Sequence, residues 1–196
     1  MDLYFVTSNK GKFETLKRNL ELNGAKNVNL IMKPLNIVEP QADSAYEISK
    51  YKAEQAYNIL KSPVVVEDGG MEIEVLNKFP GVYTRYVLET IGIKGFLKLL
   101  DGEENRTLKF ASITTFVDEK GTVHQFERGL IEYDFAHEAK NIDSPFAWSE
   151  LWKVIYVREF GKTLCEFSEE DLRKYYDMID KIGSLQKFAA WFSKNY

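Results

Sequence analysis

The sequence has a single cysteine, Cys165, which excludes a disulfide framework and a metal site built from several cysteines. Its apolar runs are only a few residues long, as in Pro63-Val64-Val65-Val66, whereas a membrane span needs about 20 apolar residues. It also lacks a basic excess, because 26 Lys and Arg stand against 30 Asp and Glu and give a net charge of −4. Proteins that bind nucleic-acid polymers usually show such an excess. We therefore expect neither a membrane nor a nucleic-acid polymer as partner.

The N-terminal segment Asp2-Leu3-Tyr4-Phe5-Val6 resembles a strand and has no basic head or small-residue cleavage site. This favours a cytoplasmic protein. Hydrophobic residues make up 44% of the chain and charged residues 29%, which excludes a disordered tail protein. The 196 residues fit one domain, residues 1–196, or two closely packed lobes.

Aromatic residues are unevenly distributed, because all three Trp lie between Ser144 and Tyr196. Rings in this terminal part are expected mainly in the core. A role for Trp148 in stacking on a nucleobase is the alternative.

Hydrophobic periodicity predicts alternating strands and helices in the first third of the chain. Ser44 and Glu47 occupy the positions of a helix N-cap and its capping box. Val64-Val65-Val66 is typical of a strand buried on both faces. The expected order is strand Leu3–Val6, helix Lys12–Leu22, strand Val28–Met32, helix Ser44–Leu60 and strand Val64–Val66. This order indicates the α/β class.

The remaining chain predicts an antiparallel segment that could form a second lobe. The expected elements are a half-exposed strand Met71–Val75, helix Ile91–Leu100, strands Leu108–Val117 and Val123–Tyr133, strand Val154–Val157, and helices near Glu169–Tyr176 and Ser184–Phe192.

The loop Thr7-Ser8-Asn9 leads from a predicted strand into a helix that carries Lys12. Unpaired amides at a helix start and nearby lysines suit an anion such as phosphate. An ordinary capping loop is the alternative. Lys52 lies on the apolar stripe of its helix, so it either extends its ammonium to the edge or meets an anion.

Glu67 and Asp68 follow the buried strand directly and precede Gly69-Gly70. Carboxylates at the carboxyl end of such a strand lie where open α/β sheets bind ligands, and they suit Mg²⁺ and activation of a water. Acidic residues that end a strand in a solvated turn are the alternative. Glu39 could add a third oxygen ligand.

These pieces, in this order, resemble the inosine triphosphate pyrophosphatase family, whose substrates are deaminated purine nucleoside triphosphates. Gly69 stands where the family has Ser or Thr. The matching segments are Thr7-Ser8-Asn9 with Lys12, Glu39-Pro40-Gln41, Lys52-Ala53, Val66-Glu67-Asp68-Gly69-Gly70-Met71-Glu72, and Leu76 to Tyr86, which includes Arg85. The resemblance is strong over roughly residues 1–117.

The resemblance implies a two-lobed α/β fold around a long mixed sheet, a homodimer, and a nucleoside triphosphate bound in the cleft between the lobes. It implies Mg²⁺-dependent attack of water on the α-phosphorus, which gives the monophosphate and pyrophosphate. By resemblance, Asp68 would activate the water and share the metal with Glu39, and Glu67 would support them. The residues that would hold the phosphates are Thr7, Ser8, Asn9, Lys12 and Lys52.

The last third departs from the family at the positions that read the base. The family has Phe-Gly-Tyr/Trp-Asp-Pro where this chain has Phe146-Ala147-Trp148-Ser149-Glu150, so Ser149 replaces an acid. The family's Ser-His-Arg aligns with Ile179-Asp180-Lys181. Phe146, Trp148 and Ser149 are the candidates for base binding, with Lys181 nearby in the alignment.

The leading hypothesis is hydrolysis of (d)ITP and XTP. A family member with altered base specificity and a nucleotide-binding relative without turnover are the alternatives. Retention of Asp68 argues against the last of these, because a binding protein has little need of a water-activating carboxylate.

Overall fold

The computed structural model describes residues 1–196 and contains a mixed sheet of nine strands. Strand β1 (Asp2–Phe5) lies parallel between β2 (Asn29–Met32) and β3 (Val64–Ile73). The sheet continues from β3 through β5 (Thr107–Val117), β7 (Glu132–Phe135), β8 (Ile155–Val157) and β9 (Lys162–Thr163). Antiparallel pairing attaches β4 (Pro80–Gly81) to β3 and β6 (Val123–Glu127) to β5. The predicted mixed α/β fold is confirmed.

Helices follow the strands in the order that the periodicity predicts, with one addition, α3. They are α1 (Lys10–Leu22), α2 (Ala45–Leu60), α3 (Thr84–Thr90), α4 (Gly92–Leu99), α5 (Glu169–Asp180) and α6 (Ser184–Asn195), with single 3₁₀ turns η1 (Glu74–Leu76), η2 (Glu150–Lys153) and η3 (Leu164–Glu166). None of the helices combines the length and the apolar character that a membrane crossing needs.

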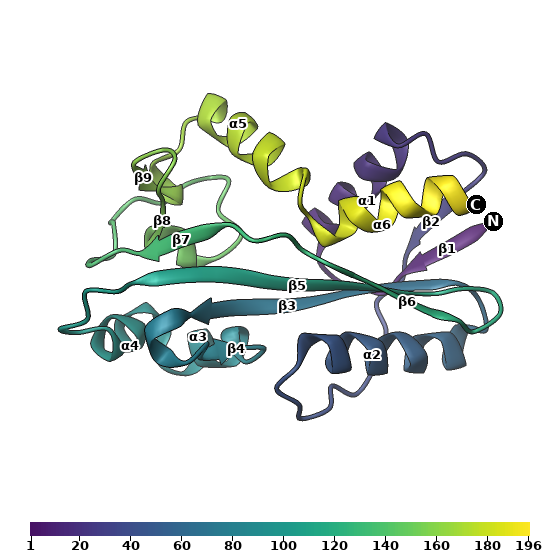
Figure 1. Ribbon diagram of the computed structural model, residues 1–196, viewed down its shortest axis with the longest axis horizontal. Helices are drawn as coiled ribbons and strands as arrows, with labels where there is room; N and C mark the ends of the chain where they lie inside the picture. The colour runs from purple at the N-terminus through teal and green to yellow at the C-terminus, as the bar shows by residue number, and fades with distance from the viewer. The chain divides into compact units, whose positions relative to one another are not determined.

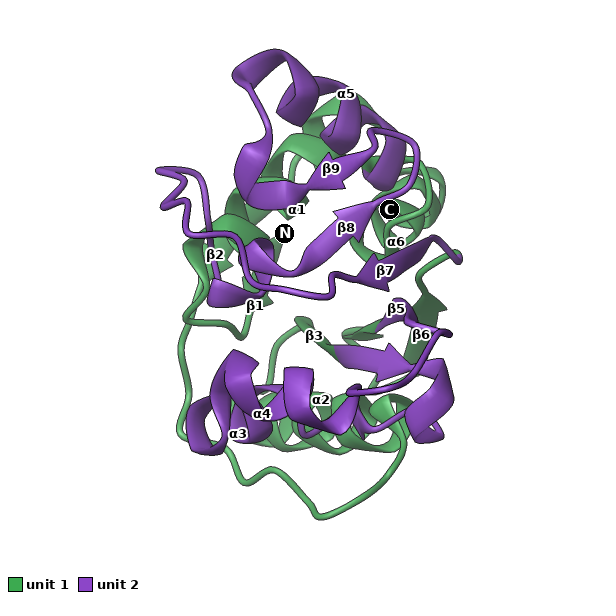
Figure 2. Ribbon diagram, turned by 90° about the vertical axis from the view of Figure 1, so that its left-hand side faces the viewer, with its two compact units in different colours: residues 1–69, 112–129, 180–196 green, residues 70–111, 130–179 purple.

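The chain divides into two compact units, which Figure 2 distinguishes by colour. The first unit comprises residues 1–69, 112–129 and 180–196, and the second comprises residues 70–111 and 130–179. The prediction of a single domain over residues 1–196 stays a prediction.

In the first unit, helices cover both faces of the strands, with α1 and α6 on one face and α2 on the other (Figure 1). Val65 belongs to the core beneath α1 and α6, together with Phe188 and Phe192. Val64 and Val66 belong to the core beside α2. The prediction that Val64-Val65-Val66 is buried on both faces is therefore confirmed.

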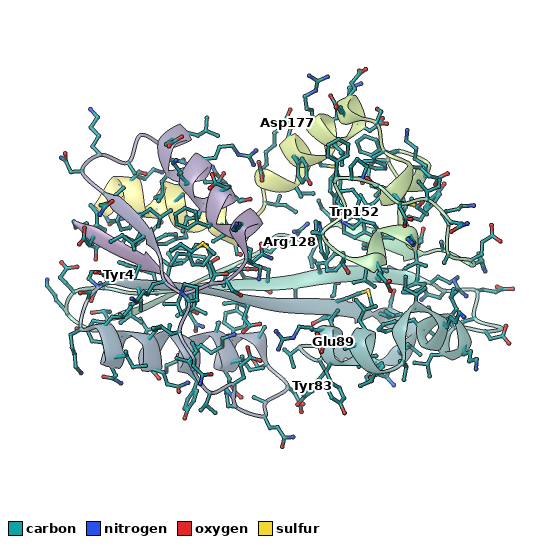
Figure 3. All side chains as sticks on the ribbon, turned by 180° about the vertical axis from the view of Figure 1, so that it is seen from behind. Tyr4, Tyr83, Glu89, Arg128, Trp152 and Asp177 are labelled. Atoms are coloured by element: carbon teal, nitrogen blue, oxygen red, sulfur yellow. The ribbon has the colours of Figure 1, made fainter.

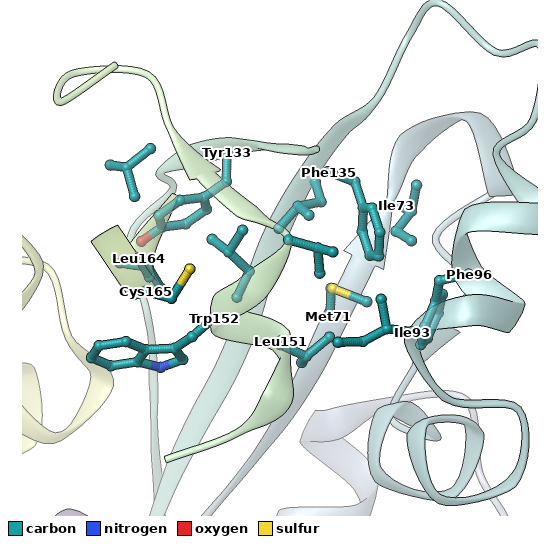
Figure 4. Packing of buried hydrophobic residues seen from close by; sticks show 14 of the residues in the cluster. Met71, Ile73, Ile93, Phe96, Tyr133, Phe135, Leu151, Trp152, Leu164 and Cys165 are labelled. Carbon is teal, nitrogen blue, oxygen red and sulfur yellow. The ribbon is translucent and has the colours of Figure 1, made fainter. Parts of the chain in front are cut away.

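The core of the second unit is rich in aromatic rings (Figure 4). Trp152 and Tyr133 are fully buried, and Cys165 lies in the same cluster as an ordinary core residue. The expected core role of the terminal aromatic residues is thus confirmed for Trp152.

Two sequence-based boundaries were wrong. The expected strands Val64–Val66 and Met71–Val75 form one strand, β3, which ends at Ile73. Met71 and Ile73 are buried and Glu72 is half-buried, as the half-exposed pattern predicts. The expected strand Val123–Tyr133 is divided into β6 and β7, because the Gly129 amide donates to the Ile182 carbonyl, before α6, at 2.8 Å.

Gly70 is required for close backbone approach within the second unit and not for a turn. A Cβ added at Gly70 would lie 1.8 Å from the carbonyl oxygen of Gly81 on β4. Because that neighbour is backbone, a larger residue has to displace the β3–β4 pairing.

We therefore expect Gly70→Ala to lower the free energy of unfolding by about 3 kcal/mol, at the upper end of overpacking costs. For a chain of this length, the midpoint of thermal unfolding should fall by about 6 to 12 °C, measured by circular dichroism. Gly11→Ala is the control, because its Cβ would meet only the side chain of Asn9, at 3.2 Å. Equal midpoints for the two variants would contradict the steric assignment.

Candidate active site

Strand β3 carries two adjacent carboxylates whose side chains have separate partners. Successive side chains of a strand point to opposite faces, so Glu67 follows the direction of Val65 and Asp68 that of Val64 and Val66. Glu67 consequently meets α1, and Asp68 meets α2. The two neighbours therefore have different partners, and their predicted roles at a metal site stay predictions.

Glu67 forms an ion pair with Lys12 in the first turn of α1. Its side chain is 9% exposed, so the carboxylate depends on the protein for its partners. The hydroxyl of Ser112 on β5 donates to Glu67 Oε1. This places a hydrogen-bonded cation on one side of the carboxylate and a neutral donor on the other.

A chain of hydroxyls continues from Ser112 to the last helix. Ser112 Oγ lies 2.7 Å from Ser184 Oγ, and Thr114 Oγ1 donates to Ser184 Oγ at 2.9 Å. Since Ser112 donates to Glu67, Ser184 donates to Ser112, and the chain runs in one direction. Sequence reasoning missed these residues, although two hydroxyls at i and i+2, on one face of a strand, are a usable signal.

The charges of Lys12 and Glu67 stabilise each other against burial. Burial alone lowers the pKa of the Lys12 ammonium, but the charge of Glu67 and its hydrogen bond outweigh this and raise that pKa above its ordinary value. Burial alone raises the pKa of Glu67, but Lys12 and Ser112 outweigh it and lower that pKa. Both groups are therefore charged at neutral pH.

On the other face, the Lys52 ammonium on α2 bridges two carboxylates. Its Nζ lies 2.6 Å from Glu39 Oε1 and 2.8 Å from Asp68 Oδ2. The Lys52 side chain is 15% exposed, whereas that of Glu39 is 53% exposed. Burial lowers the pKa of Lys52, but the hydrogen bonds to Asp68 and Glu39 outweigh it, so the pKa is raised. Of the two expectations for Lys52, contact with an anion is confirmed.

The start of α1 lies beside Lys12. Asn9 Oδ1 accepts a hydrogen bond from the Lys12 amide at 3.1 Å, and Thr7 Oγ1 accepts one from the Asn9 amide at 3.0 Å. Asn9 is thus an N-cap, as the alternative interpretation had it. Ser8 is exposed, and its role in phosphate binding stays a prediction.

Glu39 and Asp68 form a donor set that fits a hard divalent cation. No group of three or more His, Cys, Asp or Glu side chains in the structure is arranged to hold a metal ion. Mg²⁺ is usually held by one or two carboxylates together with substrate phosphates. Two carboxylates that already share one cationic group, the Lys52 ammonium, match that requirement.

The candidates for base binding belong to the second unit. Trp148 is 61% exposed, and its ring meets those of Phe110 and Trp152 edge to face at 6.4 and 6.3 Å. Phe146 is also exposed. Ser149 Oγ accepts a hydrogen bond from the Leu151 amide at 3.2 Å and so caps η2.

A pocket of about 330 Å³ adjoins these residues and includes Trp148, Ser149 and Trp152 in its wall. Trp152, labelled in Figure 3, has a buried indole Nε1 without a hydrogen-bond partner. Arg85 is exposed on α3 of the second unit, and Lys181 is exposed just before α6 of the first. Their predicted roles stay predictions.

Comparison with known proteins gives consistent matches. The model of the Ham1 family matches residues 3–177. A dITP/XTP pyrophosphatase of Methanopyrus kandleri is 35% identical over 100% of this chain and 98% of that protein. A dITP/XTP pyrophosphatase of Saccharolobus solfataricus is 41% identical over 95% of this chain and 91% of that protein.

Solved structures of other proteins share the fold. A HAM1 protein from Coxiella burnetii superposes with a TM-score of 0.80 at 16% identity and covers all of both chains. A nucleoside-triphosphatase, or dITP/XTP pyrophosphatase, from Mycobacterium abscessus gives a TM-score of 0.77 at 20% identity and covers 92% of this chain and 95% of that chain.

The Lys12–Glu67 pair can be tested through protein stability. Lys12→Met leaves a buried carboxylate without its cation, so we expect the free energy of unfolding to fall by about 2 kcal/mol, less than for a wholly buried pair because Lys12 is partly exposed. The double variant Lys12→Met with Glu67→Gln also removes the buried negative charge, so it should regain most of the lost free energy of unfolding. Urea unfolding is the measurement. A double variant as unstable as Lys12→Met alone would contradict the pairing.

Proposed function

Because the chain belongs to the Ham1 family, we propose that it hydrolyses deaminated purine nucleoside triphosphates, (d)ITP and XTP, to the monophosphate and pyrophosphate. The observation that carries this proposal is the arrangement of two lysines, Lys12 in the first turn of α1 and Lys52 on α2, against carboxylates of the middle of β3 and of Glu39. Cationic groups for phosphates and a carboxylate for a water are the two requirements of phosphoanhydride hydrolysis.

In the proposed reaction, a water oxygen bonds to the α-phosphorus while the bond from that phosphorus to the oxygen bridging the β-phosphorus breaks. The electron pair of the broken bond leaves on pyrophosphate. Asp68 accepts the proton of the attacking water, and Lys12 and Lys52 balance the charge of the phosphates. Asn9 and Thr7 hold the start of α1, whose amides favour an anion.

Glu39 and Asp68 would hold Mg²⁺. When bound, the ion supplies charge neutralisation and polarises a phosphoryl oxygen. The contact of both carboxylates with one ammonium supports this assignment.

A family member with altered base specificity is the second candidate. Ser149 stands where the family has an acid, and its hydroxyl caps η2 through the Leu151 amide. A site that has lost a polar group for the base edge discriminates less between bases. Trp148 would still supply a face for stacking, since it is exposed and held edge-on by two rings.

The homodimer and the cytoplasmic location belong to the proposal as well. The family resemblance supports the dimer.

The reaction is tested with Mg²⁺ and a panel of ITP, XTP, ATP and GTP, with pyrophosphate release as the measurement. We expect release from ITP and XTP and little from ATP and GTP. Asp68→Asn should lower kcat at least about 100-fold, as the loss of a general base does. Asp2→Asn, at the opposite end of β1, is the control and should retain activity. Release from a broad or different set would favour the second candidate, and no release from any member would refute both.

The stacking role is tested by Trp148→Ala. Because stacking on an aromatic ring contributes about 1 to 3 kcal/mol per base, we expect KM to rise by roughly 5- to 150-fold with little change in kcat. Trp148→Phe retains a ring and should restore most of the affinity. An unchanged KM for Trp148→Ala would show that the base binds elsewhere.

A further inference from the structure

The Lys52 ammonium occupies the carboxylate oxygens that a divalent cation would need. It lies 2.6 Å from Glu39 Oε1 and 2.8 Å from Asp68 Oδ2, so one positive group contacts one oxygen of each carboxylate, while Asp68 Oδ1 accepts from the Gly69 amide at 2.9 Å. Lys52 is also one of the groups proposed to bind the triphosphate. The two carboxylates use two of the three donors of this ammonium, so in this geometry at most one donor remains for a phosphate oxygen.

We propose that Lys52 is an exchangeable internal cation, which holds Glu39 and Asp68 in the free protein and transfers to the phosphates when the nucleotide binds. The carboxylates then become available to the divalent ion. This inference rests on the proposed function, because it takes the triphosphate and the metal as the ligands of the site.

The environment of Lys52 allows such an exchange. Its four-carbon stem extends from α2, and its side chain is largely covered, whereas Glu39 lies on the solvent side with its side chain 53% exposed. A divalent cation that arrives from solvent therefore meets Glu39 while the ammonium still lies between the two carboxylates. Like charges at this separation repel strongly, so ammonium and metal exclude each other.

Mutual exclusion couples the two ligands. A metal that binds only when Lys52 has left binds with an apparent affinity reduced by the fraction of molecules in which the carboxylates are free. A nucleotide that draws Lys52 away removes this penalty, and by linkage the metal favours the nucleotide by the same factor. The free protein should thus bind divalent ions weakly.

Lys12 provides a matched control. It is also a lysine at the same end of the strands, and its charge interacts with Asp68, but its ion pair is with Glu67. Removing Lys12 changes the local charge by the same amount without freeing Glu39 or Asp68. A purely electrostatic effect on metal affinity would appear in both lysine variants, whereas release of the carboxylates appears only at Lys52.

The test measures Mn²⁺ binding to the nucleotide-free protein by the electron paramagnetic resonance signal of the unbound ion. We expect Lys52→Met to bind Mn²⁺ about tenfold more tightly than the wild type, and Lys12→Met to change the affinity less than about threefold. The double variant Lys52→Met with Asp68→Asn should lose this gain in Mn²⁺ affinity, which would show that the ion binds at Asp68. Circular dichroism checks the fold, and Lys52→Gln is a second variant that retains a polar side chain.

The proposal would be overturned if Lys52→Met and Lys12→Met gained Mn²⁺ affinity equally. It would also be overturned if neither Lys52→Met nor Lys52→Gln bound Mn²⁺ more tightly than the wild type. Because this measurement uses no substrate, its outcome is independent of the triphosphate panel. A protein that passes the Mn²⁺ test but releases no pyrophosphate would refute the proposed reaction and leave the exchange at Lys52 in place.

Discussion

The two-residue period of strand β3 is the constraint on which the candidate site depends. The same alternation that buries Val65 beneath α1 and α6, and Val64 and Val66 beside α2, continues into Glu67 and Asp68. Two neighbouring carboxylates are thereby committed to different helices and to different lysines. A slip of one residue in the strand would exchange their partners and move each valine into the opposite core, so core packing and site chemistry are fixed by one register.

Each lysine of the site is held by carboxylate in the free protein. Lys12 pairs with Glu67, and Lys52 pairs with Glu39 and Asp68. The cations that suit a triphosphate are therefore kept charged and ordered without a basic surface, which agrees with the net charge of −4. The two faces differ in how firmly the lysine is held. Glu67 is largely buried and has a further donor in Ser112, whereas Glu39 is largely exposed and can release its partner.

Local signals predicted much of this arrangement, and long-range contacts explain what they missed. The buried Val64-Val65-Val66, the cap Ser44 and the placement of Lys52 on an apolar stripe depend on periodicity and capping, which one segment shows by itself. The sequence did not predict that the strand continues through Gly69-Gly70, because nothing in it reveals the carbonyl of Gly81 that approaches Gly70. The break between β6 and β7 likewise depends on the Ile182 carbonyl, which is remote in sequence from Gly129.

The aromatic residues near the C-terminus support the site through packing. The Ham1 family model ends at residue 177, yet α6 lies beyond it and packs on α1 in the first unit. Phe188 and Phe192 of α6 meet Phe116 of β5 at ring distances of 5.3 and 5.7 Å. This packing holds Ser184, at the first position of α6, against Ser112, which donates to Glu67. Because Glu67 in turn holds Lys12, the rings that cluster near the end of the sequence help to fix a group proposed to bind phosphate. Trp148, in contrast, is exposed, and its role in base stacking stays a proposal.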